Sequence, residues 1–241
     1  MPIIKLNATD STNLYLKELT LTQSLEDYTI VSAKLQLNGR GQMGSKWHSE
    51  EGKNLTVSIL KKFKNFPATK QFHLNCIVCL TIYDVLNELA VPNLSVKWPN
   101  DILSGNQKIC GILVENILQG KFISKSILGI GLNVNQMNFS TLENASSIKQ
   151  ILGSNLDYDL DKLLSKITRR LKFNFDLSES VMREKYTTLL FRKDKPSTFS
   201  NPKGILFSGF IRGIDESGKL MVELENQMLM KYGLKEIQLL Y

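Results

Sequence analysis

Short apolar runs separated by turns constrain the fold of this chain more than any other feature of its sequence. Four of these runs are rich in β-branched residues and predict strands: 28–35, 54–60, 109–114 and 122–134. By contrast, the long apolar segment from about residue 68 to 90 predicts one main buried helix, which ends before Pro92. Many strands with few helices predict a mixed β-sheet of the α+β class.

The two ends of the chain differ in their predicted secondary structure. Near the start, Ser11 or Asp10 is the predicted N-cap of a helix, and the periodic apolar residues over 160–190 predict one or two amphipathic helices. Beyond Pro196 the sequence changes to short strands and tight turns, which predict a small β-barrel. The predicted domains are residues 1–192 and 193–241.

The composition excludes several classes of protein. Of the 241 residues, 42% are hydrophobic, and 30 basic against 23 acidic residues give a formal charge of +7. This is enough apolar material for a substantial core. We find no signal-peptide pattern at the N-terminus and no run near the ~18 apolar residues of a membrane span, so we expect a cytoplasmic protein without a membrane contact. The basic charge leaves nucleic acid, an anionic substrate and an acidic protein as possible partners.

The three cysteines predict neither a disulfide framework nor a metal site. Cys76 and Cys79 form a Cys-x-x-Cys pair, which would also suit a redox dithiol or half of a zinc site. However, both lie among apolar positions of the long predicted helix, and Cys110 is the only other thiol. We therefore predict that these cysteines pack in the core, where free cysteines are commonly found.

Residues 39–44 match the pattern G-x-G-x-x-G of dinucleotide-binding proteins letter for letter. That site requires a helix directly after the glycines, so that the helix N-terminus faces the pyrophosphate. Here residues 45–52 lead into a predicted strand instead. We therefore predict a flexible loop whose backbone N–H groups, with Arg40 and Lys46, close over a phosphate-containing ligand.

Charged residues lie close together in the segment 97–101, Lys-Trp-Pro-Asn-Asp, which is followed by Lys108 and by 111–115, Gly-Ile-Leu-Val-Glu. A plain core strand would not tolerate this composition without a specific purpose. Phosphoryl or adenylyl transfer needs a cation near the developing charge, and Lys108 is of that type. It also needs carboxylate or amide groups for Mg²⁺, and Asp101 and Asn100 supply them.

Taken in order along the chain, these segments resemble the biotin protein ligase family. The resemblance rests on residues 10–13, Gln36, 39–41, Trp47, Gly52 with 54–55, 97–101, Lys108 with 111–115, and 129–135, Gly-Ile-Gly-Leu-Asn-Val-Asn. It covers the catalytic region nearly end to end, and the tail resembles the family's SH3-like domain more loosely. The fold it implies is a class II synthetase-like catalytic domain with a small C-terminal SH3-like β-barrel.

The resemblance also implies an activity. Such a ligase activates biotin with ATP to biotinyl-5′-AMP, with Mg²⁺, and then transfers biotin to a lysine of a biotin carboxyl carrier protein. The mixed anhydride must be shielded from water until the amine arrives. No enzyme nucleophile is needed, and the sequence contains no evident Ser-His-Asp or Cys-His arrangement.

The site residues implied by the resemblance fall into three groups. The catalytic group comprises Lys108, Arg40 and Asp101, with Asp101 also a candidate metal ligand. The biotin group comprises Ser11, Thr12, Asn13, Gln36, Gly39, Arg40, Lys108 and Gly111. The ATP group comprises Arg40, Gln42, Trp47, Asn100, Lys108, Gly129 and Asn133.

Two departures from the family pattern carry expectations of their own. Gln42 and Ser45 stand where the family loop commonly has arginines, and a neutral group binds phosphate less strongly than a guanidinium. We therefore expect the adenylate to leave more readily, unless Lys46 compensates. In addition, the family motifs begin at Thr9, which leaves no room for the DNA-binding domain of some members. We expect no operator binding.

Two alternatives and one open question remain at this level. A lipoate or octanoate ligase or transferase would share the architecture, with Cys110 as a candidate nucleophile beside Lys108. A non-enzymatic basic module that binds nucleic acid would explain the charge, although not the spacing from Lys97 to Glu115. The oligomeric state is open between a monomer and a homodimer.

Overall fold

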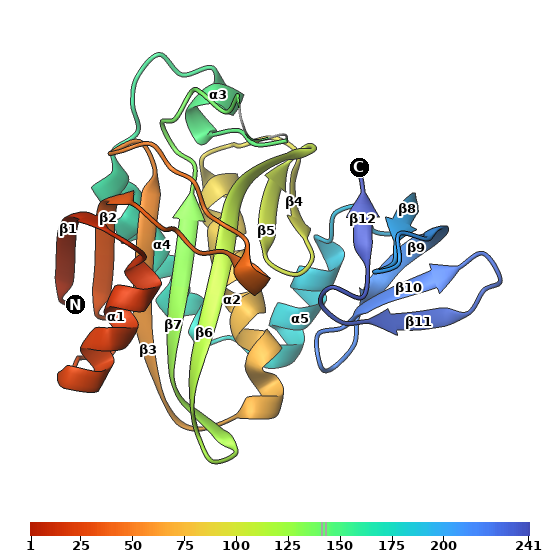
Figure 1. The fold of residues 1–241 in the computed structure, drawn as a ribbon, viewed down its shortest axis with the longest axis horizontal. Coiled ribbons are helices and arrows are strands. Elements are labelled where there is room, and N and C mark those ends of the chain that lie inside the picture. Colours follow the sequence, from red (N-terminus) through yellow and green to blue (C-terminus); the bar gives the residue numbers. More distant parts are fainter. Residues whose placement is uncertain (141, 143) are drawn as a thin grey trace.

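Two β-sheets organise the chain, as Figure 1 shows. The structure is a computed structural model and describes residues 1–140, 142 and 144–241. The larger sheet has seven strands in the order β1-β2-β3-β7-β6-β5-β4. Its strands are β1 (Ile3–Thr9), β2 (Ile30–Gln36), β3 (Leu55–Pro67), β4 (Leu94–Lys97), β5 (Asp101–Ser104), β6 (Gln107–Gln119) and β7 (Phe122–Leu132). Only β1 and β2 pair in parallel, so the sheet is mixed, as predicted.

Helices cover both faces of this sheet. They are α1 (Thr12–Thr22), α2 (Gln71–Glu88), α3 (Ile148–Leu152), α4 (Leu160–Phe175) and α5 (Glu179–Thr188). In Figure 1, α1 lies in front of the sheet and α4 behind it. Under α1, Leu16 packs in a small cluster of buried residues. On the opposite face the larger core includes Ile77 and Leu80 of α2 and Ile167 of α4, so most of the buried apolar residues lie behind the sheet.

Local sequence signals explain where the helices begin and end. Ser11 caps α1, its hydroxyl accepting from Leu14 N at 3.5 Å, and this N-cap was predicted. The carboxylate of Asp159 caps α4 in the same way. The main helix α2 follows a short 3₁₀ turn, Ala68–Lys70, and ends at Glu88, ahead of Pro92.

All three cysteines are free and buried, which confirms that they pack in the core. Burial raises the thiol pKa of Cys76, Cys79 and Cys110, so none of them is an activated nucleophile. Within the described residues, no group of three or more His, Cys, Asp or Glu side chains could hold a metal ion. In the same part of the chain, no helix is both long and apolar enough to cross a membrane.

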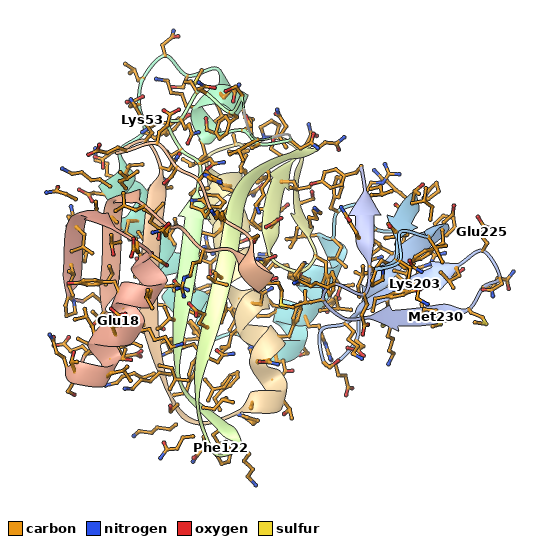
Figure 2. All side chains as sticks on the ribbon, in the orientation of Figure 1. Glu18, Lys53, Phe122, Lys203, Glu225 and Met230 are labelled. Carbon is orange, nitrogen blue, oxygen red and sulfur yellow. The ribbon has the colours of Figure 1, made fainter. Side chains whose placement is uncertain are left out.

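The second sheet is antiparallel and is formed by the C-terminal part of the chain. Its five strands, in the order β11-β10-β9-β8-β12, are β8 (Pro196–Ser200), β9 (Leu206–Ile214), β10 (Leu220–Leu224), β11 (Leu229–Tyr232) and β12 (Gln238–Leu240). Figure 2 labels Lys203, Glu225 and Met230 in this part of the chain, with Glu225 at the end farthest from the larger sheet. The predicted domain boundary, between residues 192 and 193, precedes β8.

The two sheets meet at the turn between β9 and β10. The indole Nε1 of Trp98 donates to the carbonyl of Gly218 at 2.9 Å. Gly218 has a φ of +88°, and a β-carbon there would lie only 2.1 Å from the ring of Phe72. The C-terminal sheet is therefore packed directly against the segment 97–101.

Candidate active site

The floor of the candidate site is a row of three residues across the front face of the larger sheet. In register, Gly131 on β7 faces Gly111 on β6, and Gly111 faces Asp101 on β5. Glycine weakens the interior of a strand, so its presence usually marks a close approach. Here the approach is that of Trp47, because a β-carbon on Gly131 would lie 2.4 Å from its indole.

A β-bulge brings the predicted lysine onto this floor. The register of β5 and β6 shifts between Ile102 and Leu103, so that Ile109 is an extra residue on β6. Without the bulge, strand alternation would send Lys108 and Gly111 to opposite faces. With it, Lys108 Nζ lies 2.8 Å from Asp101 Oδ1, so the two residues form an ion pair on the floor.

The first turn of α1 forms one wall of the site. Thr12 donates from both its backbone N and its hydroxyl to Gln36 Oε1, at 2.8 and 3.0 Å. The hydroxyl of Ser58 lies 2.7 Å from that of Thr12 and 2.5 Å from Asn13 Oδ1. Asn13 Nδ2 donates to Glu115 at 2.8 Å. These bonds hold Asn13 between α1 and the sheet. Asn13 therefore lines the site, but its side chain already forms hydrogen bonds within the protein.

Ser58 and Glu115, which hold this wall in place, were not predicted as site residues. Ser58 lies in the middle of a strand whose only visible signal is apolar, and Glu115 belongs to a quoted motif but received no role. Gly129 was predicted to bind ATP, and that role stays a prediction; the structure shows that a β-carbon there would lie 2.3 Å from Asn13 Oδ1. Only the pairing of strands far apart in sequence could have identified Ser58.

The glycine-rich loop folds as a short hairpin over the floor. Arg40 and Lys46 form an isolated antiparallel bridge, and Trp47 N donates to the carbonyl of Gly39 at 2.9 Å. The tip is a 3₁₀ turn, Gln42–Gly44. The chain then runs into β3 without an α-helix, so this glycine pattern is not a dinucleotide fingerprint, as predicted.

Ser45, one of the two departures from the family pattern, has a structural task in this turn. Its hydroxyl donates to the carbonyl of Gln42 at 2.8 Å, and its backbone carbonyl accepts from Gly41 N at 2.7 Å. The other departure, Gln42, faces a cavity, as does Lys46. Lys46, together with Arg40, is therefore the cation of this loop that can compensate for the arginines absent at positions 42 and 45.

A cavity of about 140 Å³ lies between the floor, the α1 wall and the loop. It brings together most of the residues that the sequence analysis selected. These are Ser11, Thr12, Asn13, Gln36, Arg40, Gln42, Trp47, Asn100, Asp101, Lys108, Gly111 and Gly129. Asp101 is the only carboxylate among the described residues that line it.

Gly39 and Asn133 do not line this cavity. Gly39 lies where the two arms of the loop cross, and a β-carbon there would be 2.4 Å from the carbonyl oxygen of Trp47. Asn133 is buried and donates through Nδ2 to the carbonyl of Ser146 at 3.0 Å. Its Oδ1 has no partner among the described residues. The binding roles of both residues stay predictions.

Trp47 covers the floor in a way that suits a ligand site. Its ring lies 5.8 Å from Lys108 Nζ, measured to the ring centroid, and rests against the two facing glycines. Its indole Nε1 is buried and has no hydrogen-bond partner in the described part of the chain. A buried donor without an acceptor is uncommon in folded proteins and is compatible with an acceptor supplied by a ligand.

Comparisons with known proteins agree with this geometry. Residues 6–133 match the model of the biotin/lipoate A/B protein ligase family. The bifunctional ligase/repressor BirA of Escherichia coli is 32% identical over 224 residues, which cover 89% of this chain and 67% of that protein. A biotin–[acetyl-CoA-carboxylase] ligase of Paracoccus denitrificans is 34% identical over 128 residues, about half of each chain.

Solved structures extend the likeness to the whole fold. The biotin protein ligase from Aquifex aeolicus in complex with biotin and ATP superposes with a TM-score of 0.80 and 27% identity, covering 99% of this chain and 98% of that one. The fold class and the family resemblance are thereby confirmed. The alternative of a transferase that uses Cys110 as nucleophile is disfavoured, because this thiol is buried. The chain belongs to the biotin/lipoate A/B protein ligase family, and within it to the biotin protein ligases.

Proposed function

We propose that this chain joins biotin to ATP in the 140 Å³ cavity and then passes the biotinyl group to a lysine of a biotin carboxyl carrier protein. In the first step a biotin carboxylate oxygen attacks the α-phosphorus, and pyrophosphate leaves. In the second step the acceptor amine attacks the carbonyl of the mixed anhydride, AMP leaves and the amine loses a proton. The observation that carries the proposal is the Lys108–Asp101 pair on a glycine floor beneath a cationic loop.

The role assigned to Lys108 is charge stabilisation in both steps. Its ammonium group is held at 2.8 Å by Asp101 and reaches the cavity from the floor. A cation in this place stabilises the phosphate oxygens as pyrophosphate leaves, and then the oxyanion formed when the amine attacks. Such preorganised charge needs no movement at the moment of reaction.

The remaining lining residues divide between the two substrates. Thr12 and Gln36, with Ser11, form the wall that we assign to biotin, because their hydroxyl and amide groups suit its polar head. Arg40 and Lys46 come from the loop and suit the phosphates. Trp47 closes the floor against water, which would otherwise hydrolyse the adenylate.

Mg²⁺ fits this residue set only as a metal held largely by the nucleotide. Asp101 is the single carboxylate of the described cavity lining, and Asn100 lies beside it. Mg²⁺ is commonly held by one or two carboxylates together with substrate phosphates and water. We assign Asp101 and Asn100 to it, where the metal would neutralise phosphate charge.

The names of the relatives suggest the acceptor, because the ligase from Paracoccus denitrificans is named for acetyl-CoA carboxylase. A second cavity, of about 270 Å³, shares Gln42 with the first and is lined by Val114 and Asn116 of β6 and by the turn residues Gly218 and Lys219. We propose that the acceptor lysine approaches along it. The formal charge of +7 would attract an acidic carrier surface.

Biotin-dependent exchange between ATP and pyrophosphate tests the first step. We expect exchange with biotin, and none with lipoate or octanoate measured in parallel. Exchange with lipoate would move the chain to the lipoate branch. Silence with all three acids, together with nucleic-acid binding that survives Lys108→Ala, would instead favour a basic binding module.

A further inference from the structure

The carbonyl of Pro99 is the point where the segment 97–101 meets the helices behind the sheet. It accepts a hydrogen bond from the hydroxyl of Tyr186 on α5 at 2.7 Å. It also accepts one from Nδ2 of Asn75 on α2. The thiol of Cys79 on α2, with its Sγ 3.9 Å from the same oxygen, is a third and weaker donor. Rotation of the peptide between Pro99 and Asn100 would break the bonds from Tyr186 and Asn75.

This peptide leads directly into the site. Asn100 and Asp101 follow Pro99, and both line the first cavity. The backbone carbonyl of Asn100 accepts from Ile112 N at 3.0 Å, which registers the segment against β6. The orientation of the Pro99–Asn100 peptide therefore decides how Asp101 enters β5 and faces Lys108.

Tyr186 itself touches neither the cavity nor a substrate position. Its side chain is fully buried, and its ring packs edge-on against Phe72 at 5.6 Å between centroids. Burial raises the pKa of Tyr186 well above its ordinary value, so the hydroxyl remains a donor. The family motifs in the first 135 residues do not include it, because it lies on a helix far along the chain.

We propose that Tyr186 is a positioning residue whose hydroxyl orients the Pro99–Asn100 peptide and so aligns Asp101 with Lys108. The inference rests on the proposed function, in which Lys108 stabilises the charge of adenylate formation. A hydroxyl on the opposite side of the sheet would thereby control the rate of a reaction that it does not contact.

The substitution Tyr186→Phe removes the hydroxyl and keeps the ring. We expect the exchange rate at saturating biotin and ATP to fall about tenfold, with the KM for biotin changed less than about twofold, because the biotin wall does not depend on Pro99. The matched control is Thr168→Val. It removes another buried hydroxyl, which donates to the carbonyl of Leu164 at 2.8 Å on α4, and it should leave the rate unchanged.

A double-mutant cycle separates positioning from general loosening. If Tyr186 acts through Asp101, Tyr186→Phe should have less than about a twofold effect on the residual exchange of Asp101→Asn. A full tenfold effect in that background would contradict the proposal, as would a Tyr186→Phe enzyme with an unchanged rate. If Tyr186→Phe fails to fold, Asn75→Ala removes a second donor to Pro99 and must lower the rate in the same way.

The same experiment keeps this inference apart from the function on which it rests. Absence of exchange by the unmodified chain would contradict the proposed function and, with it, the role of Tyr186. If the unmodified chain and the Tyr186→Phe variant both exchange, and at the same rate, the proposed role of Tyr186 is contradicted and the proposed function is not.

Discussion

Two lysine–aspartate pairs of this protein have similar geometry and different surroundings. Lys108 Nζ lies 2.8 Å from Asp101, and Lys61 Nζ lies 2.5 Å from Asp27. Lys61 is enclosed by three aromatic rings, with the centroid of Tyr28 at 4.5 Å. Lys108 has one ring nearby, that of Trp47, and a cavity in front of it.

The difference in surroundings shows why only one of these ion pairs is a candidate reaction centre. The side chain of Lys61 is 16% exposed, and its contacts with aromatic rings and Asp27 leave it little room for a ligand. The side chain of Lys108 is 35% exposed and lines the cavity, while the facing glycines beside it make room for the Trp47 ring. Charge and distance are alike in the two pairs, so the cavity in front of Lys108 is what separates them.

The sharpest way to break this comparison is to remove each lysine in turn. We expect Lys108→Ala to lower biotin-dependent exchange by about 10²- to 10³-fold with little change in melting temperature, since its charge acts on the transition state. Lys61→Ala should instead lower the melting temperature and leave exchange unchanged well below it, because a charged partner and cation–π contacts are lost. Exchange rates and thermal unfolding of both variants decide the matter. Equal losses of activity would mean that the two pairs are not functionally distinct.

A methyl group on the floor tests whether the cavity depends on the close seat of Trp47. In Gly131→Ala the new β-carbon would meet the Trp47 indole, so we expect loss of biotin binding and at least a tenfold loss of exchange. Titration with biotin measures the first and exchange the second. As a control, Gly120→Ala lies in the β6–β7 turn, where a β-carbon meets nothing within 4 Å. Its φ of +59° makes it costly to stability, yet it should not affect biotin binding.

The loop above the floor offers a smaller and opposite change. Gln42→Arg should slow release of the adenylate several-fold, because a guanidinium binds phosphate more strongly than an amide. Dissociation of biotinyl-5′-AMP from the two proteins measures this. Equal release rates would show that Arg40 and Lys46 already supply the needed charge.

The smallest expected effect concerns the aromatic surroundings of Lys61. Burial, and then Asp27, raise the pKa of Tyr28 from 10 to about 12. The folded state therefore binds the phenol proton more tightly than the unfolded state does. This contribution to stability is complete below pH 10 and is lost as the pH rises towards 12. Denaturant unfolding between pH 9 and about 12 should show a weaker decline for Tyr28→Phe than for the parent, and parallel curves would contradict this.

Much of the fold and of the site was predictable because the signals are local. Ser11 as an N-cap, the long helix and the strands of the central sheet follow from residue types at short spacing, and all three predictions are confirmed. The glycine loop was recognisable as something other than a dinucleotide site, because the residues after it predict a strand. The roles of individual side chains, the Mg²⁺ site, the domain boundary and the absence of operator binding stay predictions.

Other features could not be read from the chain because they depend on contacts distant in sequence. Ser58 joins the site only when β3 lies beside β7 and α1 lies over both. Tyr186 reaches Pro99 across 87 residues, and no local pattern distinguishes it from a tyrosine of an ordinary amphipathic helix. Glu115 and Asn13 each belonged to a quoted motif, but the hydrogen bond between them was not predicted.

The sequence by itself determined which residues have the chemistry of an adenylate-forming site: a lysine, an aspartate, paired glycines and a cationic loop in a specific order. Only the tertiary structure decided that they converge. The bulge at Ile109 turns Lys108 to the face of Asp101, and strand pairing sets Gly111 opposite Gly131. The physical reason is that residue type sets charge and size through local bonds, whereas register and face depend on hydrogen bonds between strands that the chain brings together only on folding.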